Sequence, residues 1–247
     1  MTKETVFTLD NVSFGYDENK FVLEKISFDV NKGDFIALLG ANGTGKSTLL
    51  KILNGLIFPN EGKISFLGKD LNEKSLKDVD FKFFFRKEVA FLFQNSDVQL
   101  FCSTVEEELS FTLLQLGLPQ PEIEKRVIEI AKIFDIIDFL PLSPHKLSEG
   151  EKKKIAFASL LPQNPSVFLL DELTSNLDPK NERFAKDFLK TLHNSQKTLI
   201  CATHDLDFAK SFADKIAVIG QNHNICAFGE TKEVLENEKL LLKENII

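Results

Sequence analysis

A glycine-rich stretch, GANGTGKST at residues 40–48, carries the strongest chemical pattern in the sequence. It satisfies the spacing G-x-x-x-x-G-K-[ST] and lies between a continuous apolar run and a segment whose leucines recur at helical spacing. Glycines let backbone N–H groups close around phosphate oxygens, and the positive end of the following helix strengthens that attraction. A glycine-rich turn without a ligand is the alternative, but the full motif in this position favours a phosphate-binding loop.

The side chains of this loop have roles that follow from their chemistry. Lys46 is expected to reach the β- and γ-phosphates of a nucleotide, and the Ser47 hydroxyl is expected to bind Mg²⁺. We expect Lys46 to act in catalysis as well as in binding. The other nucleotide-binding positions predicted in the loop are Gly40, Asn42, Gly43, Thr44, Gly45 and Thr48.

A second apolar stretch, VFLLDE at residues 167–172, ends in two acids. A buried strand can place Asp171 beside the hydration shell of Mg²⁺, and Glu172 can then orient or deprotonate an attacking water. The alternative is a strand followed by a solvated acidic turn, which is common in isolation. Beside a phosphate-binding loop the catalytic interpretation is favoured, and the two motifs together indicate a P-loop NTPase.

The elements that must hold these residues are typical of an α/β core with a helical insertion. Apolar residues nearly alternate in VFTLDNVSFGY and VLEKISFDV, and FIALLG is a continuous run typical of a strand buried on both faces. VFLLDE, TLICATH and KIAVIG are further short apolar strands, whereas residues 94–162 show a mostly helical pattern punctuated by prolines. We predict a single domain over residues 1–247, with a core at 1–93 and 163–247 and a helical subdomain at 94–162.

The composition narrows the classes of function. The 43% hydrophobic and 27% charged content is ordinary for a soluble globular protein, and the net charge of -7 argues against a nucleic-acid partner held by general electrostatics. No apolar run reaches the roughly 18 residues that suggest a membrane span, and MTKETVFTLD lacks the apolar core of a signal peptide. The three cysteines are Cys102, Cys201 and Cys226, and they do not have the spacing of metal ligands. They are expected to be reduced thiols of a cytosolic protein.

Four further features follow one another in a fixed order along the chain. Gln94 ends the apolar strand VAFLF, LSEGE begins at Leu147, SNLD spans residues 175–178, and His204 ends TLICATH. Together with the two motifs above, this ordered set resembles the ATP-binding cassette (ABC) family over nearly the whole chain. The resemblance implies an ABC-type nucleotide-binding domain with an inserted helical subdomain, hydrolysis of ATP to ADP and phosphate, and Mg²⁺ as the accompanying ion.

The resemblance also implies roles for single residues. Gln94 corresponds to the glutamine that contacts the metal ion and the attacking water, His204 to the histidine that holds the γ-phosphate, and Asp178 to an aspartate at the dimer interface. Tyr16, which lies 24 positions before Gly40 (40 − 16), corresponds to the aromatic residue that stacks on adenine. Alone, Tyr16 is as compatible with a strand-edge aromatic, and a single histidine is more often structural. The order and spacing of the whole set favour the functional roles.

The stretch LSEGE, at residues 147–151, departs from the LSGGQ that is usual in the family. Ser148 and Glu151 form an S-x-x-E capping box, so an ordinary capped helix is the simple interpretation. In the family, this helix N-terminus points at the γ-phosphate of ATP bound to the opposite subunit, through the serine and the second glycine. These two are kept as Ser148 and Gly150, and Glu149 and Glu151 are expected to adjust and cap the same helix end.

A finer pattern lies in FQNSDVQLFCSTVEEELSFTLLQLGLP, at residues 93–119. It resembles the ATPases of energy-coupling-factor (ECF) importers, which power the uptake of cobalt, nickel or vitamins, although Ser96 replaces the usual proline. The cluster FKFFFRKEVAFLF before it is unusually aromatic, and packing is its expected role. The ECF resemblance implies a transmembrane coupling subunit and a substrate-binding membrane subunit as partners, with the chain peripheral on the cytoplasmic face of the membrane.

One phosphate loop and one LSEGE stretch imply that a complete site needs two chains, as a homodimer or as a heterodimer with a paralogue. Two other functions stay open as alternatives. One is a soluble ABC ATPase without a transport role. The other is an ATP-dependent binding switch with negligible hydrolysis, against which Glu172 and His204 argue.

Overall fold

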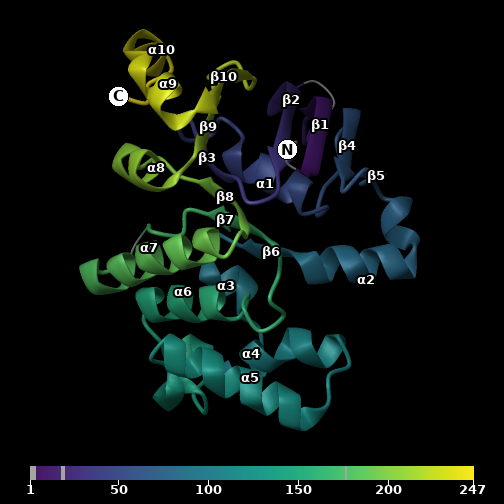
Figure 1. The fold of residues 1–247 in the computed structure, drawn as a ribbon, viewed down its shortest axis with the longest axis vertical. Coiled ribbons are helices and arrows are strands. Elements are labelled where there is room, and N and C mark those ends of the chain that lie inside the picture. Colours follow the sequence, from purple (N-terminus) through teal and green to yellow (C-terminus); the bar gives the residue numbers. More distant parts are fainter. Residues whose placement is uncertain (1–3, 18–19, 176) are drawn as a thin grey trace.

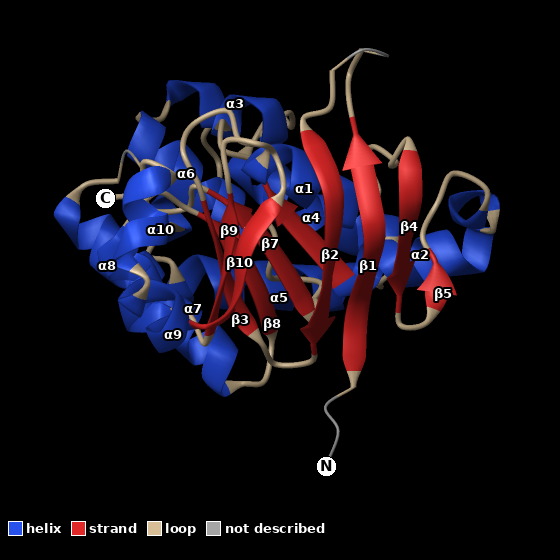
Figure 2. Cartoon of the chain, turned by 90° about the horizontal axis from the view of Figure 1, so that it is seen from above, coloured by secondary structure: helices blue, strands red, loops and turns tan. Residues whose placement is uncertain are grey.

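The computed structural model describes residues 4–17, 20–175 and 177–247, which fold into an α/β domain with two sheets (Figures 1 and 2). One sheet is antiparallel, with the strand order β2-β1-β4-β5, and the other has the order β10-β9-β3-β8-β7-β6. The strands are β1 (Thr5–Phe14), β2 (Leu23–Asn31), β3 (Phe35–Leu39), β4 (Glu61–Phe66), β5 (Lys69–Asp70), β6 (Val89–Leu92), β7 (Val167–Asp171), β8 (Thr198–Ala202), β9 (Lys215–Ile219) and β10 (Ile225–Glu230). The α-helices are α1 (Lys46–Leu53), α2 (Val79–Glu88), α3 (Ser96–Gln99), α4 (Val105–Gln115), α5 (Gln120–Ile133), α6 (Glu149–Ala158), α7 (Pro179–Asn194), α8 (Leu206–Phe212), α9 (Thr231–Glu236) and α10 (Glu238–Lys243).

The second sheet brings the chemically important segments to one edge. Its strands β3, β6, β7, β8 and β9 pair in parallel, and nearly all of their residues are buried, as their apolar runs predict. The carboxyl ends of parallel strands meet at the same edge, so the segments that end or follow β3, β6, β7 and β8 converge there. These segments carry the phosphate loop, Gln94, Asp171 with Glu172, and His204.

Two apolar cores cover the two faces of this sheet. Successive side chains of β3 point to opposite faces of the sheet. Phe35, Ala37 and Leu39 therefore belong to one core, and Ile36 and Leu38 belong to the other. The first core includes buried residues of helices α4 to α8, and the second includes those of α1, β1, β2 and β4. The antiparallel sheet therefore packs on the α1 side of the molecule, away from the helices that follow β6 (Figure 1).

Helices α3 to α6 lie between β6 and β7 in the chain and form the part of the molecule below the second sheet in Figure 1. The mostly helical pattern predicted over residues 94–162 corresponds to these helices, of which α4 and α5 have 11 and 14 residues. The ring of Phe134 meets those of Phe157, Phe184 and Phe188 edge to face at centroid distances of 5.7, 5.0 and 5.1 Å, which ties α6 and α7 to the end of α5. The exact subdomain limits at residues 94 and 162 stay a prediction.

Helix α2 contains the first half of the aromatic cluster FKFFFRKEVAFLF, for which the sequence predicts packing but no helix. The Asp78 carboxylate caps it by accepting hydrogen bonds from two backbone N–H groups of the first turn, a local signal that the aromatic composition obscures. Phe81 and Phe85, one turn apart, are buried, whereas Phe83 and Phe84 are 48% and 42% exposed. Packing therefore accounts for only part of the phenylalanine cluster.

The helices are short in the parts of the chain that the structure describes. The longest of them, α7, has 16 residues and buries one face through Ala185, Leu189 and Leu192. Within those described parts, no helix has both the length and the apolar character that crossing a bilayer demands.

Candidate active site

The phosphate loop is a tight turn between β3 and α1 whose backbone needs glycine. Gly43 and Gly45 have φ angles of 83° and 111°, in the left-handed region that favours glycine. A Cβ atom at Gly45 would lie 2.6 Å from the carbonyl oxygen of Val22. Gly45 is also the N-cap of α1, and no side chain caps this helix there. The first N–H groups of α1 are therefore available to an anion, as the sequence predicts.

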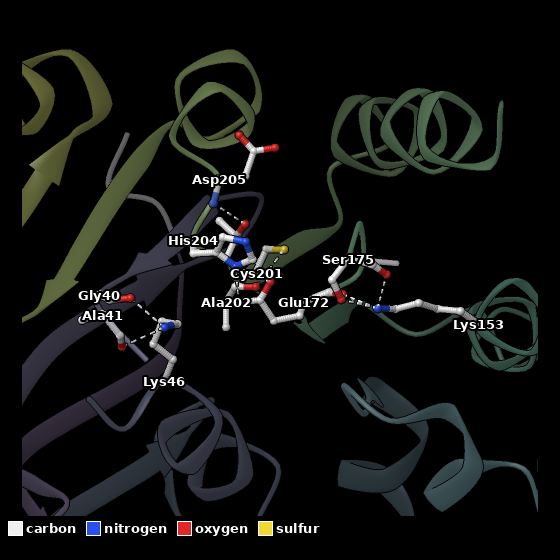
Figure 3. A network of polar contacts seen from close by, with 11 residues as sticks. Gly40, Ala41, Lys46, Lys153, Glu172, Ser175, Cys201, Ala202, His204 and Asp205 are labelled. Atoms are coloured by element: carbon white, nitrogen blue, oxygen red, sulfur yellow. Dashed lines mark hydrogen bonds and ion pairs between the residues drawn. The ribbon is translucent and has the colours of Figure 1, made fainter. Parts of the chain in front are cut away.

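Lys46, the first residue of α1, is buried and folds back over the loop. Its Nζ donates hydrogen bonds to the carbonyl oxygens of Gly40 at 2.7 Å and Ala41 at 3.1 Å (Figure 3). Burial lowers the pKa of the Lys46 ammonium, and the nearby carboxylates of Glu172 and Asp171 oppose that shift. The cation can thus exchange two loop carbonyls for phosphate oxygens without leaving the cleft.

Asp171, the last residue of β7, has the surroundings of a metal-binding carboxylate. It is buried, and its Oδ1 atom has no hydrogen-bond partner among the described residues. Burial raises its pKa, while the hydrogen bond from Ser47 and the charge of Lys46 act in the opposite direction. A buried carboxylate oxygen that lacks a partner and lies beside a hydroxyl matches the oxygen ligands that Mg²⁺ prefers. The residues present therefore fit the ion predicted from the sequence.

Glu172 follows directly and is held in an unusual backbone conformation. Its φ angle of 53° lies in the left-handed region, and its N–H donates to the carbonyl oxygen of Ala202 in β8 at 3.0 Å. The Nδ1 atom of His204 lies 3.1 Å from its Oε1 and 3.0 Å from its Oε2 (Figure 3). The carboxylate is nearly buried, whereas the His204 side chain is 69% exposed. The two predicted catalytic side chains thus meet at the rim of the site.

A cleft of about 430 Å³ joins these residues. Most of its lining was predicted as nucleotide- or metal-binding, and the segment after β6 adds the exposed Gln94. Val22, just before β2, also lines the cleft and was missed, because nothing in its residue type or spacing marks it. The residues around the cleft are Val22, Asn42, Gly43, Gly45, Lys46, Ser47, Thr48, Gln94, Asp171 and Glu172.

Tyr16 lies next to the phosphate loop, beyond the residues that line the cleft. Its ring is 59% exposed and meets Phe14 edge to face at a centroid distance of 4.9 Å. Its hydroxyl lies 3.3 Å from Oγ1 of Thr48 in α1. An exposed aromatic ring at this place is available to stack on a base.

The LSEGE stretch forms the N-terminus of α6, and its predicted capping box is confirmed. The N–H of Glu151 donates to Ser148 Oγ, and Glu151 Oε2 accepts from the N–H and the hydroxyl of Ser148 at 2.8 and 2.7 Å. These hydrogen bonds lower the pKa of the Glu151 carboxyl. Ser148 and Glu149 are exposed and Gly150 is half-buried, and none of the three lines the cleft of its own chain.

Asp178 caps the next helix, α7, outside the cleft. Its carboxylate accepts from the backbone N–H groups of Lys180 at 2.8 Å and Asn181 at 3.0 Å, and these bonds lower its pKa. Of the SNLD stretch, Asn176 lies outside the described residues. A dimer-interface role for Asp178 stays a prediction.

Lys153 directly follows LSEGE and Lys152, where its sequence position predicts at most a counter-charge to Glu149 and Glu151, yet it contacts the catalytic segment. Its Nζ donates to the carbonyl oxygens of Glu172 and Ser175 and to Ser175 Oγ (Figure 3). Its burial could have been predicted, because helical spacing places Lys153 on the same face of α6 as the buried Ala156 and Phe157. A lysine on a buried helix face needs a polar partner.

Comparison with known proteins agrees with this geometry. Residues 23–175 match the ABC transporter family. The chain belongs to this family. It is 47% identical to a putative ABC transporter ATP-binding protein of Caldanaerobacter subterraneus subsp. tengcongensis, over 99% of this chain and 100% of the relative. It is 40% identical to the energy-coupling factor transporter ATP-binding protein EcfA of Methanocaldococcus jannaschii, over 94% of this chain and 82% of the relative.

Two solved structures of family members share the fold. CbiO1 from Clostridium perfringens, described as part of the ABC transporter complex cbiONQ, aligns with a TM-score of 0.81 and 30% identity, over 99% of this chain and 96% of its own. The ATP-binding cassette MJ0796, a dimer bound to ADP and phosphate after hydrolysis, aligns with a TM-score of 0.82 and 26% identity, over 91% and 98%. The chain is thus an ABC ATPase, and its domain is one that binds ATP.

Proposed function

We propose that the chain is the ATP-hydrolysing subunit of an ECF-type importer for cobalt or nickel ions or for a vitamin. The observation that carries the enzymatic part is the convergence of Lys46, Ser47, Asp171 and Glu172 on one cleft that Gln94 completes. The similarity to EcfA and to CbiO1 favours an ECF importer over a soluble ABC ATPase.

The chain's own residues account for binding of the triphosphate. The N–H groups at the start of α1 and the ammonium of Lys46 attract the phosphate oxygens, and Tyr16 provides a surface for the adenine. Mg²⁺ would be held by Ser47 and Asp171 with Gln94 beside them, and when bound it neutralises phosphate charge.

Hydrolysis itself needs a water and a base. The oxygen of the water forms a bond to the γ-phosphorus while Glu172 accepts a proton from that water. The bond between the γ-phosphorus and the β-phosphate oxygen breaks, and ADP leaves. His204, which contacts the carboxylate in the structure, holds the γ-phosphate in this scheme. Glu172 adopts a left-handed backbone conformation and lines the cleft that the triphosphate would occupy.

The complete site is proposed to form between two chains that are arranged head to tail. Ser148, Gly150 and Glu151 lie at an exposed helix N-terminus, outside the cleft of their own chain, and would serve ATP on the partner. Asp178 would lie at the same interface. The partner is a second copy or a paralogue, and the dimeric state of the related cassette supports this arrangement.

The membrane partners are proposed to dock beside the Gln94 segment. The elements that follow it carry exposed apolar side chains, among which Val98, Phe101 and Leu114 are 64%, 63% and 53% exposed. The ring of Phe101 meets that of Phe111 in α4 at a centroid distance of 4.8 Å, so part of this surface is preformed. A transmembrane coupling subunit would cover it and connect the chain to a substrate-binding membrane subunit, which places the chain at the cytoplasmic face of the membrane.

Two measurements test the proposal. Purified protein with Mg²⁺ and ATP should release phosphate, and Glu172→Gln should lower turnover by about a hundredfold or more while ATP binding persists. Co-expression with a transmembrane coupling subunit and a substrate-binding membrane subunit of the ECF type should yield a complex that takes up labelled cobalt, nickel or vitamin in vesicles. ATPase activity with a purely soluble complex would instead support the soluble alternative.

A further inference from the structure

Lys153 is a buried cation in α6 that none of the roles above uses. The residue is 4% exposed, and its side chain leaves the helix toward the segment that follows β7 (Figure 3). Phe134, Phe157 and Leu173 line the same small apolar cavity as Lys153. A neutral apolar side chain would fill such a place without the desolvation that a buried charge suffers.

The ammonium finds all of its acceptors in one short segment. Lys153 Nζ donates to the backbone carbonyl of Glu172, to the carbonyl of Ser175 at 2.9 Å and to Ser175 Oγ at 2.7 Å. Ser175 Oγ in turn donates to the Glu172 carbonyl at 2.8 Å. An ammonium has three N–H donors, so these three contacts satisfy it completely. The network therefore joins α6 to the four-residue segment Glu172–Ser175.

The position of Glu172 depends on hydrogen bonds to its backbone N–H and to its backbone carbonyl. Its N–H is held by Ala202 of β8, and its carbonyl is held by Lys153 and by the N–H and hydroxyl of Ser175. A non-glycine residue at a φ of 53° persists only where surrounding contacts favour that conformation. Lys153 is the member of this set that comes from the helix beginning at Ser148.

We propose that Lys153 is a positioning residue for hydrolysis: it holds the backbone of Glu172 so that the carboxylate faces the water site. The inference rests on the proposed function, because it assigns to Lys153 a part in ATP hydrolysis by this cleft. In the proposed dimer, the N-terminus of α6 also presents Ser148 to the partner's ATP. Lys153 therefore connects Glu172, which acts on the ATP bound to its own chain, with the helix that contacts the ATP bound to the partner.

The test compares Lys153→Met, which keeps the apolar stem and removes the ammonium, with Lys153→Arg, which restores donors. The matched control is Lys125→Met in α5, where the parent side chain is 74% exposed. For each full-length variant, steady-state phosphate release gives kcat and KM, a fluorescent ATP analogue gives affinity, and size-exclusion chromatography with ATP reports dimer formation.

The expected result for Lys153→Met is a kcat lower by about tenfold, with KM and nucleotide affinity within about threefold of the parent. ATP-bound dimer should accumulate, because nucleotide still binds and hydrolysis is slow. Lys153→Arg should recover kcat to within about threefold of the parent, and Lys125→Met should match it. A purely structural lysine would lower the melting temperature without this separation of kcat from KM.

Parental kcat in Lys153→Met would overturn the proposal, and so would a change in KM alone or a loss of ATP-driven dimer in a folded variant. If Lys153→Met does not fold, Ser175→Ala removes one acceptor of the same network and should lower kcat by about threefold, with unchanged kcat counting against the proposal. An inactive parent protein would overturn the proposed function and this role together, whereas an active parent with an active Lys153→Met refutes only the role of Lys153.

Discussion

The substitution Ser148→Ala distinguishes a helix cap from a phosphate contact. Ser148 Oγ accepts from the N–H of Glu151 and donates to its Oε2, so alanine removes the side-chain half of the capping box. Loss of such a cap lowers the free energy of unfolding by about 1 kcal/mol, or about 2–4 °C in melting temperature for a chain of this size. If the hydroxyl also reaches the partner's γ-phosphate, ATP turnover falls at least about tenfold, which corresponds to about 1.4 kcal/mol in the transition state.

Helix α4 offers a matched control for this experiment. Thr104 and Glu107 form the same type of capping box, in which each residue's side chain accepts from the other's N–H at 3.2 Å. Thr104→Ala should therefore reduce the melting temperature as much as Ser148→Ala does, but leave the turnover of the isolated ATPase intact. Both variants are measured by thermal unfolding and by phosphate release at saturating ATP. Parental turnover in Ser148→Ala would refute the reasoning that this helix end serves a phosphate.

Further predictions concern the phosphate loop, the buried carboxylate of Asp171, the proposed adenine contact of Tyr16 and Glu149 in the LSEGE stretch. Gly45→Ala should abolish nucleotide binding in calorimetry, because the new Cβ would lie 2.6 Å from the Val22 carbonyl oxygen at a φ of 111°; parental affinity would show that the loop tolerates it. Burial raises the pKa of Asp171, so the stability of the nucleotide-free protein should fall as pH rises through that raised pKa. Asp171→Asn should then raise the melting temperature at pH 7 while removing ATPase activity, and a lower melting temperature would contradict the burial argument. Tyr16→Ala should raise KM for ATP by about tenfold and Tyr16→Phe should not, if stacking is the contact. Glu149→Gly should leave turnover unchanged or raise it, and a tenfold loss would mean that this carboxylate is needed.

Local patterns in the chain were enough to predict the main elements of the cleft. The phosphate loop requires glycine conformations and a helix start within nine residues, and Asp171 with Glu172 ends an apolar run. Parallel strands that are buried on both faces must bring their carboxyl ends to one edge, so the convergence of these motifs follows from the strand pattern. The capping box of Ser148 and Glu151 is local as well, because its two residues lie within one helical turn.

Contacts between distant segments could not be predicted in this way. The Lys153 side chain gives no sign of its partner 19 residues away, and the hydrogen bond between His204 and Glu172 spans 32 residues. Helix α2 depends on packing as well, because aromatic residues are also common in strands and this helix buries Phe81 and Phe85 on one face. Which charges are buried, and which polar atoms must then satisfy them, depends on how whole elements pack. Residue spacing along one element therefore predicts where a catalytic group can lie, and packing between elements sets how it is held.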